Sequence, residues 1–353
     1  MTWLLEHASN AIRYRALVDV GRLTGELVRE ATVLSYAFPP ALALAVAQSS
    51  DGTWSGSMLD VPSGKAGHAE RVGTINAFRR LLEYGWEKDA PPLLRARRVL
   101  FRLLAEDDDP AYLFELASHV ENDPDLAHRG RSILREAAAA ALAQAGYEGD
   151  PRLRGAARRI LDRVDAFLRS PLAHKPWVRV GNKQVLAQEA VPPSIYALAM
   201  LAHMPFFRNE NHVQLDRIFQ YLSQPQPRQE LMQLLGSQIV AQPHLVLGDM
   251  LPNRNVADAD VPFALAWLEL MARLGFLRRN EVWSKLFERF LDDRDRDLVW
   301  HPHKGMTMPR SSNPFVWPAF PLEQMTSGDE RWTDVTFRLG LIARLSGRPL
   351  ELV

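Results

Sequence analysis

The helical character of this chain is clearest in residues 258–276, which read DADVPFALAWLELMARLGF. Pro262 suits the first turn of a helix, where no backbone N–H is needed, and Gly275 is the residue type that most often ends one. Between them only Glu269 and Arg273 are charged, at the i, i+4 spacing of an ion pair. A helix this apolar predicts burial within a larger helical body.

The composition indicates a large core and no charge bias. Of the 353 residues, 47% are hydrophobic and 24% are charged, which is typical of a globular protein. The 42 lysines and arginines balance 42 aspartates and glutamates. This balance argues against a nucleic-acid partner, whose binding surface would add a basic excess.

The cysteine count and the N-terminus bear on the compartment. The chain contains no cysteine, which excludes disulfides and thiolate metal sites and fits a reducing environment. Residues 1–7 carry neither a basic region nor a long apolar run, so we expect no signal peptide and a cytoplasmic location.

One uncharged stretch, residues 190–207, is long enough to raise the question of a membrane segment. Pro192, Pro193 and Pro205 leave room for only one short helix, roughly 194–204. We therefore predict a buried core helix. Peripheral contact with one face of a bilayer is the alternative.

Helical periodicity dominates the rest of the chain. A short strand is expected only at 177–180, and residues 41–48 are expected to form a short buried helix. Further helices are predicted over residues 68–84, 91–106, 110–121, 124–145, 151–169, 209–223, 227–239, 280–292 and 332–345.

A weak repeat supports an array of helical hairpins. Gly85-Trp86, Gly146-Tyr147 and Gly275-Phe276 each follow a predicted helix and precede the next one. A glycine C-cap followed by an aromatic residue is a typical end of a helix. Recurrence of this unit predicts stacked hairpins, which six units would close into an α/α barrel; an open superhelix is the alternative.

Residues 48–54 read QSSDGTW and fit the pattern Gln-x3-Gly-x-Trp. This pattern resembles the QW repeat of the terpenoid cyclase and protein prenyltransferase superfamily, whose fold is an α/α toroid. The Gln48 amide is expected to hydrogen-bond the end of a neighbouring helix, with Trp54 stacked on that pair. A degraded copy lies at 324–328. With the hairpin repeat, the resemblance predicts a single all-α domain over residues 1–353, an α/α toroid.

Residues 258–261, DADV, resemble the Asp-x-Asp-Asp motif of class II terpene cyclases. The resemblance implies that Asp260 is the general acid and Asp258 its orienting partner. Val261 stands where that family has a third carboxylate. From the residues alone, a buried carboxylic acid with a partner could protonate carbon, but the same aspartates could cap the following helix.

Carbocation chemistry also needs an aromatic lining, because ring faces stabilise cations. The residues proposed for this substrate-binding role are Trp54, Trp267, Trp300, Phe315 and Trp317, with Phe320 as a further candidate. Ordinary core packing is the alternative for each of them.

Residues 300–305, WHPHKG, place His301 and His303 in a long loop. Such a pair could join a carboxylate such as Asp258 around a metal, or belong to a polar lid over an active site. The superfamily's zinc site includes a cysteine, which this chain lacks, and we predict neither a metal nor a cofactor. The acidic runs 107–109 and 292–295 are interpreted as a helix cap and a solvated turn.

Three functions remain open at this stage. The first is a class II terpene cyclase-like enzyme, an isomerase acting on a hydrophobic small molecule in an apolar cavity. The second is a non-catalytic toroid that binds a protein partner. The third is a carbohydrate-active α/α-barrel enzyme, in which Asp258 and Asp260 supply the acids, His301 or His303 assists, and Trp54 or Trp317 stacks on sugar.

Overall fold

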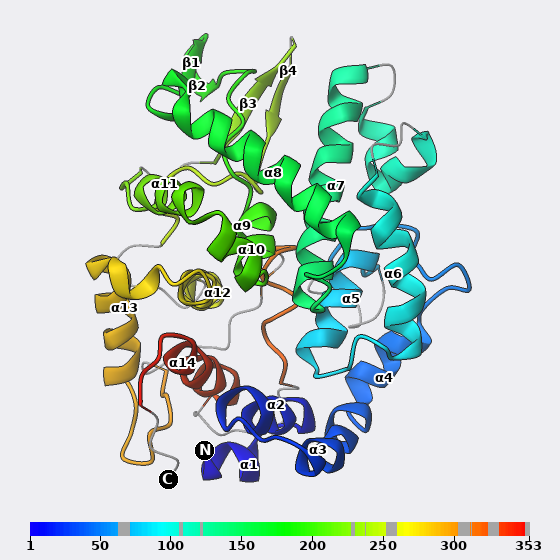
Figure 1. The fold of residues 1–353 in the computed structure, drawn as a ribbon, viewed down its shortest axis with the longest axis vertical. Coiled ribbons are helices and arrows are strands. Elements are labelled where there is room, and N and C mark those ends of the chain that lie inside the picture. Colours follow the sequence, from blue (N-terminus) through cyan, green and yellow to red (C-terminus); the bar gives the residue numbers. More distant parts are fainter. Residues whose placement is uncertain are drawn as a thin grey trace. The chain divides into compact units, whose positions relative to one another are not determined.

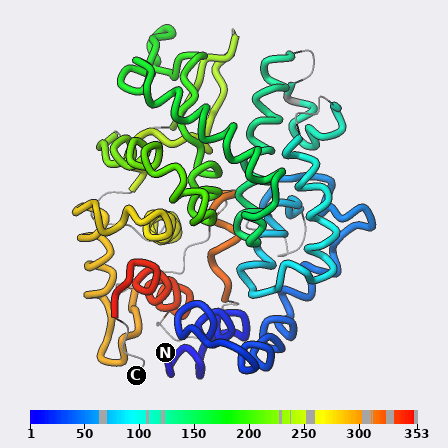
Figure 2. Tube along the Cα trace, viewed as in Figure 1, coloured from blue at the N-terminus to red at the C-terminus, as the bar shows by residue number. Residues whose placement is uncertain are grey.

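The computed structural model describes residues 1–62, 71–105, 109–120, 123–226, 230–236, 238–251, 260–302, 311, 313–323 and 332–349. The chain divides into two compact units (Figures 1 and 2). Unit 1 comprises Met1–Ala96 and Leu251–Val353, and unit 2 comprises Arg97–Met250. The single domain predicted over residues 1–353 stays a prediction.

Unit 1 contains the helices of both ends of the chain. Its first part has α1 (Thr2–His7), α2 (Asn10–Arg15), the π-helical turn η1 (Ala16–Val20), α3 (Glu26–Tyr36), α4 (Pro39–Val46), α5 (Thr74–Glu83) and the start of α6 (Pro91–Leu103). Its second part has α12 (Val261–Arg273), the short 3-10 turn η5 (Leu277–Arg279), α13 (Glu281–Asp292) and α14 (Thr333–Leu345). The last helix, α14, packs against α1, α2, η1 and α12, so it lies among the first helices of the chain (Figure 1).

Unit 2 is arranged around one long helix, α7 (Pro124–Gln144). The other elements are the 3-10 segment η2 (Pro110–His119), α8 (Pro151–Arg169), the 3-10 turn η3 (Pro171–Ala173), α9 (Ile195–Ala202), α10 (Pro205–Glu210) and α11 (His212–Leu222). Helix α7 contacts η2, α8 and α9. The five alanines 137–141 on α7 are fully buried, and their small side chains let α9 pack closely against it.

Unit 2 also contains a four-stranded mixed sheet in the order β1-β2-β3-β4. Strands β1 (Trp177–Val180) and β2 (Lys183–Leu186) form one antiparallel hairpin, and β3 (Met232–Leu235) and β4 (Gln238–Ala241) form another. Strand β2 pairs with β3 in parallel, through Leu186 and Gln233. The prediction of an all-α fold, and with it of an all-α toroid, is therefore wrong. The short strand expected at 177–180 is confirmed as β1.

The helix predicted over 227–239 is also wrong, because β3 and the start of β4 lie there. Leu231, Leu234 and Leu235 have the spacing of a helical face. In the folded chain, however, burial alternates along β3 as in a strand with one covered face. Gly236, at a φ of 57°, allows the chain to reverse into β4.

The helix expected at 41–48 is present as α4, but it is not a buried helix. Only Ala41 and Leu44 on this helix are buried, whereas Val46 is 84% exposed. An apolar sequence therefore predicted the helix but not its exposure.

The repeated helix ends are confirmed. Trp86, Tyr147 and Phe276 donate their backbone N–H groups to the carbonyls of Leu81, Leu142 and Met271, at 3.0, 3.1 and 2.8 Å. Each preceding glycine has a positive φ, of 89° at Gly85, 81° at Gly146 and 77° at Gly275. This is the Schellman pattern, which satisfies carbonyls that the helix leaves free.

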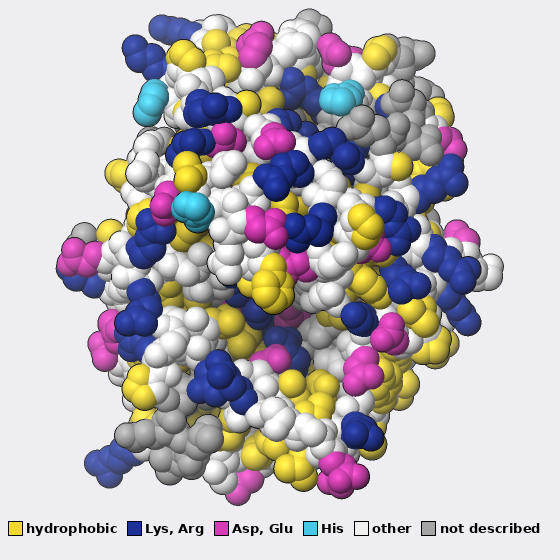
Figure 3. All heavy atoms as spheres, in the orientation of Figure 1, with side chains coloured by type: hydrophobic (Ala, Val, Ile, Leu, Met, Phe, Trp, Pro, Cys, Tyr) yellow, Lys and Arg dark blue, Asp and Glu magenta, His cyan; other side chains and the backbone are white. Residues whose placement is uncertain are grey.

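The uncharged stretch 190–207 contains α9, in which every residue is buried. The predicted core helix is therefore confirmed. Among the described residues, no helix is both long enough and apolar enough to cross a membrane. On the face shown in Figure 3, basic and acidic side chains are interspersed, in keeping with the balanced charge of the chain.

A buried network of charges joins the helices of unit 1. Arg338 on α14 lies between Glu83 on α5 and Glu269 on α12, with N–O distances of 2.6 and 2.8 Å. Arg15 on α2 adds a second contact to Glu83, at 2.7 Å, and Arg273 adds one to Glu269, at 2.9 Å. Burial opposes ionisation of Glu83, but Arg338 and Arg15 outweigh it and hold the pKa of this carboxyl well below its usual value.

We predict that Glu83→Gln destabilises the protein by about 3–5 kcal/mol, because it leaves two buried guanidinium groups with too little negative charge. The low pKa of Glu83 means that its contribution is present above the pKa of an unfolded glutamate and is lost as the pH falls below it. The difference between the variant and the wild type should therefore shrink in acid. Urea unfolding at neutral and acidic pH measures both effects.

The control is Glu281→Gln, which removes an exposed i, i+4 pair with Lys285. An equal loss of stability in both variants would contradict a special role for the buried network.

Candidate functional site

The predicted acid Asp260 directly precedes α12 and is partly exposed. It is the N-cap residue of the helix, although its side chain makes no capping hydrogen bond. Asp258, its predicted partner, and His303 lie outside the described residues.

The hydrogen bond predicted for Gln48 is confirmed. Its side-chain amide donates to the carbonyl of Pro92 in the first turn of α6, at 2.8 Å, and to that of Gly52 at 3.0 Å. The buried Trp54 indole donates to the carbonyl of Leu44 on α4, at 2.7 Å. These bonds join α4, the following loop and α6, which is a structural role.

Two of the predicted aromatic residues belong to separate packed clusters. The Trp267 ring lies edge-on to Trp283, with centroids 6.2 Å apart, and parallel to Phe263. The Trp300 ring lies 5.2 Å from that of Trp332. Both predicted residues are almost fully buried, and their rings pack as core residues do, although neither indole N–H has a hydrogen-bond partner in the described part of the chain.

Phe315 and Trp317 pack against arginines of α5. The guanidinium carbon of Arg79 lies 5.0 Å from the Phe315 ring, and that of Arg80 lies 5.0 Å from the Trp317 ring. Arg80 also donates to the Trp317 carbonyl at 2.7 Å. Phe320 is buried. The two arginines thus fix this segment to α5.

His301 forms a local pair with Asp295, at 2.9 Å. Partial burial of Asp295 is outweighed by N–H groups of Val299 and Asp297 and by His301, which lower the pKa of its carboxyl. This matches the turn predicted at 292–295. Asp109 caps η2 through the Ala111 N–H, as predicted for that run, whose other two residues are not described. No group of three or more potential metal ligands occurs in the described ranges.

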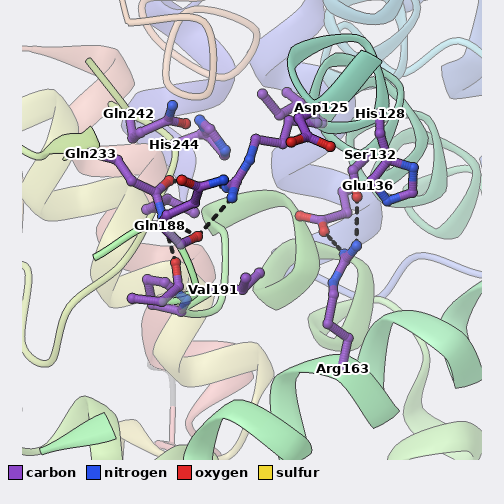
Figure 4. Close-up of a pocket in the computed structure, with 15 residues that line it drawn as sticks. Asp125, His128, Ser132, Glu136, Arg163, Gln188, Val191, Gln233, Gln242 and His244 are labelled. Atoms are coloured by element: carbon purple, nitrogen blue, oxygen red, sulfur yellow. Dashed lines mark hydrogen bonds and ion pairs between the residues drawn. The ribbon is translucent and has the colours of Figure 1, made fainter. Parts of the chain in front are cut away.

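A different site lies within unit 2, in a pocket of about 270 Å³ (Figure 4). One wall is a single face of α7. Asp125, Arg129, Ser132 and Glu136 follow one another at helical spacing along it. The first is exposed and the last is buried, so the wall runs from solvent to the core over about 16 Å of helix.

The opposite wall comes from the segments around the sheet. It contains Gln188, Ala190, Val191, Pro192, Gln233, Gln242, His244 and Leu245. Gln233 on β3 is buried and fixes this wall, because its amide donates to the carbonyls of Ala187 and Ala190 at 2.9 and 2.7 Å.

Glu136 at the inner end of the pocket joins three helices. Its carboxylate accepts hydrogen bonds from Arg163 on α8 and from the Ser194 hydroxyl. Ser194 in turn accepts from the Ala197 N–H at 2.9 Å and so caps α9. Burial raises the pKa of Glu136, although Arg163 and Ser194 act against this.

Arg129 is held in place by neutral oxygens. Its guanidinium donates to the carbonyl of Gln188 at 2.7 Å and to Oε1 of Gln233 at 3.3 Å. Burial lowers the pKa of this side chain, while the nearby charges of Asp125 and Glu189 raise it. In the part of the chain that the structure describes, no carboxylate lies within ion-pair distance of Arg129.

Gln242 and His244 follow β4 and point toward the middle of the pocket in Figure 4. Gln242 is only 7% exposed. Within the described ranges, neither side chain has a hydrogen-bond partner. Burial lowers the pKa of His244 to about 4, so the ring is neutral at physiological pH. A buried amide and a neutral imidazole that face open space are available to a ligand or to water.

Sequence reasoning did not identify this site. The polar residues from Asp125 to Glu136 share one face of α7, and this pattern was visible in the sequence. A helix usually turns such a face to solvent, whereas here it lines a pocket. The pattern alone did not reveal its partners, since they come from a segment more than fifty residues later.

Comparisons with protein-family models, with curated proteins and with solved structures found no match. The pocket is therefore interpreted from its own chemistry.

We predict that His244 makes the protein less stable in weak acid. An unfolded histidine takes up a proton near pH 6.5, whereas folded His244 does so only near pH 4. Between these values the unfolded state binds more protons, so stability falls as the pH falls. At pH 5 the cost is about 2 kcal/mol.

In His244→Gln this cost is absent, so the variant should gain stability relative to the wild type between pH 7.5 and pH 5. Urea unfolding at both pH values gives the difference. The exposed His212→Gln variant of the same unit is the reference. Equal pH dependence of the two variants would contradict the buried neutral state of His244.

Proposed function

We propose that the protein binds a small polar molecule in the pocket of unit 2, next to Glu136. The observation that carries this proposal is the convergence of Arg129, Gln242 and His244 on one pocket, where the described residues do not supply partners for all their polar groups. Buried polar groups cost free energy unless they are hydrogen-bonded, so a site of this kind is favoured when a ligand completes it.

The volume of the pocket limits the size of the ligand. About 270 Å³ corresponds to roughly nine water molecules at their share of liquid volume. This is slightly below the range of about 300–1,000 Å³ for small-molecule sites, so the ligand should be small. Ile133, Val191 and Leu245 supply an apolar part of the lining, so the ligand should combine a polar end with a small apolar body.

Glu136 supports an acid–base role at the same site. A carboxyl group whose pKa is raised by burial holds its proton at a higher pH than an ordinary glutamate. Arg163 and Ser194 orient it from the side of the helices. Binding without any reaction is the alternative, and it uses the same residues of the same pocket.

We predict that pools of small polar metabolites include one that raises the thermal unfolding temperature. A ligand at a hundred times its Kd stabilises the native state by about 2.7 kcal/mol. Ile133→Trp, which fills the pocket, should abolish the shift, and Arg98→Gln, an exposed arginine of the same unit, should retain it. No shift with any pool, or a shift that persists in Ile133→Trp, would contradict the proposal.

A second proposal keeps Asp260 as a general acid for protonation-initiated cyclisation of a hydrophobic small molecule. It is supported by the partly exposed position of Asp260 directly before a helix whose residues are mostly buried and apolar. The Gln48 hydrogen bond adds to the resemblance on which this proposal rests.

For this second proposal, we expect purified protein to convert a prenyl diphosphate or squalene into a cyclic product, detected by mass spectrometry. Asp260→Asn should lower the rate at least about a hundredfold, because general acids contribute that much or more. The exposed Asp89→Asn variant is the matched control. Cyclisation that survives in Asp260→Asn would remove the assignment of the acid, and no product from any substrate would remove the activity.

A further inference from the structure

We infer that the ligand of the unit 2 pocket is a small monocarboxylate, whose carboxylate group lies against Arg129, Gln242 and His244. This inference rests on the binding site proposed above and names the class of molecule that it takes.

The charges of the pocket favour one negative charge on the ligand. The lining contains two arginines, Arg129 and Arg163, and two acids, Asp125 and Glu136. Arg163 is paired with Glu136. Among the described residues, only neutral oxygens make hydrogen-bond contact with Arg129, from Gln188 and Gln233. Asp125 and Glu189 are near enough to act on this charge but form no direct ion pair with it, so an incoming anion can supply that pair.

The donors are held in place before any ligand arrives. A guanidinium has five N–H donors, and two of those on Arg129 bind Gln188 and Gln233, so three remain. Gln233 is itself fixed to two backbone carbonyls. An arginine fixed in this way loses little side-chain entropy on binding, and its planar fork suits a carboxylate.

Gln242 and His244 supply further hydrogen-bond donors from the opposite wall of the pocket. The amide of Gln242 offers N–H donors, and a neutral imidazole carries one N–H in either tautomer. A carboxylate accepts up to about four hydrogen bonds. Arg129, Gln242 and His244 together therefore offer enough donors for both of its oxygens.

Other ligand classes fit this set less well. A phosphate dianion needs more positive charge than one unpaired arginine provides, and Asp125, one turn away on α7, repels it. A neutral polyol offers the partly buried Arg129 no direct ion pair. The apolar surface of Ile133, Val191 and Leu245 suits the hydrocarbon body of a short-chain or single-ring acid.

The test is calorimetric titration of the full-length protein with matched probes at about pH 7. The probes are benzoate and hexanoate, their neutral amides benzamide and hexanamide, and the phosphate monoesters phenyl phosphate and pentyl phosphate. We expect a carboxylate to bind at least about tenfold more tightly than its amide, since charge-assisted hydrogen bonds contribute this much. Equal or tighter binding of the amide or of the phosphate would overturn the inference.

Two variants and one control variant locate the effect. Arg129→Gln should remove the preference for carboxylate over amide, and Arg98→Gln should keep it. Gln242→Glu has nearly the same shape but adds a negative charge, so it should weaken carboxylate binding about tenfold and spare the amide. A loss of both probes in Gln242→Glu, with circular dichroism unchanged, would mean that Gln242 only supports the structure and would also overturn the inference.

The outcomes separate this inference from the proposed function. A polyol or another class of molecule could raise the unfolding temperature of the wild type but not of Ile133→Trp, while no carboxylate binds. In that case the inference of a carboxylate ligand fails, and the proposed binding site is retained. If no class binds, both fail.

Discussion

The carboxylate of Glu136 is the contact on which the arrangement of unit 2 depends. It joins α7, on which it lies, to Arg163 of α8 and to Ser194, the residue that caps α9. Removing it would leave an arginine and a helix cap without their partner at the same time. Because the same group forms the inner end of the pocket, the stability of the helices and the chemistry of the site are coupled through one side chain.

The helices of unit 1 are also joined by buried polar side chains, and more of these are charged. Arg338, Glu83 and Glu269 are all buried or nearly so, and each has at least one oppositely charged partner. Buried ion pairs are rarely a large net source of stability, because desolvation offsets their attraction. Their effect is to restrict how α5, α12 and α14 can pack, since other arrangements would leave a charge unpaired.

The two units differ in where polar groups meet open space, because those of unit 2 named below line a pocket. The charges of unit 1 bind one another, and its arginines Arg79 and Arg80 hold the segment that contains Phe315 and Trp317. In the pocket of unit 2, Gln242, His244 and part of Arg129 have no such partners in the described ranges. This difference is why unit 2, and not the aromatic residues of unit 1, carries the main functional proposal.

The sequence by itself determined the features that depend on a few neighbouring residues. The helix ends at Gly85, Gly146 and Gly275 could be predicted, because a positive φ and two local hydrogen bonds suffice. Only the tertiary structure decided that residues 232–241 form strands, since their apolar spacing fits either structure and pairing with β2 selects one. It also decided the site: Glu136 and His244 are far apart in the chain, and the burial that changes the pKa of each comes from elements that local sequence does not specify.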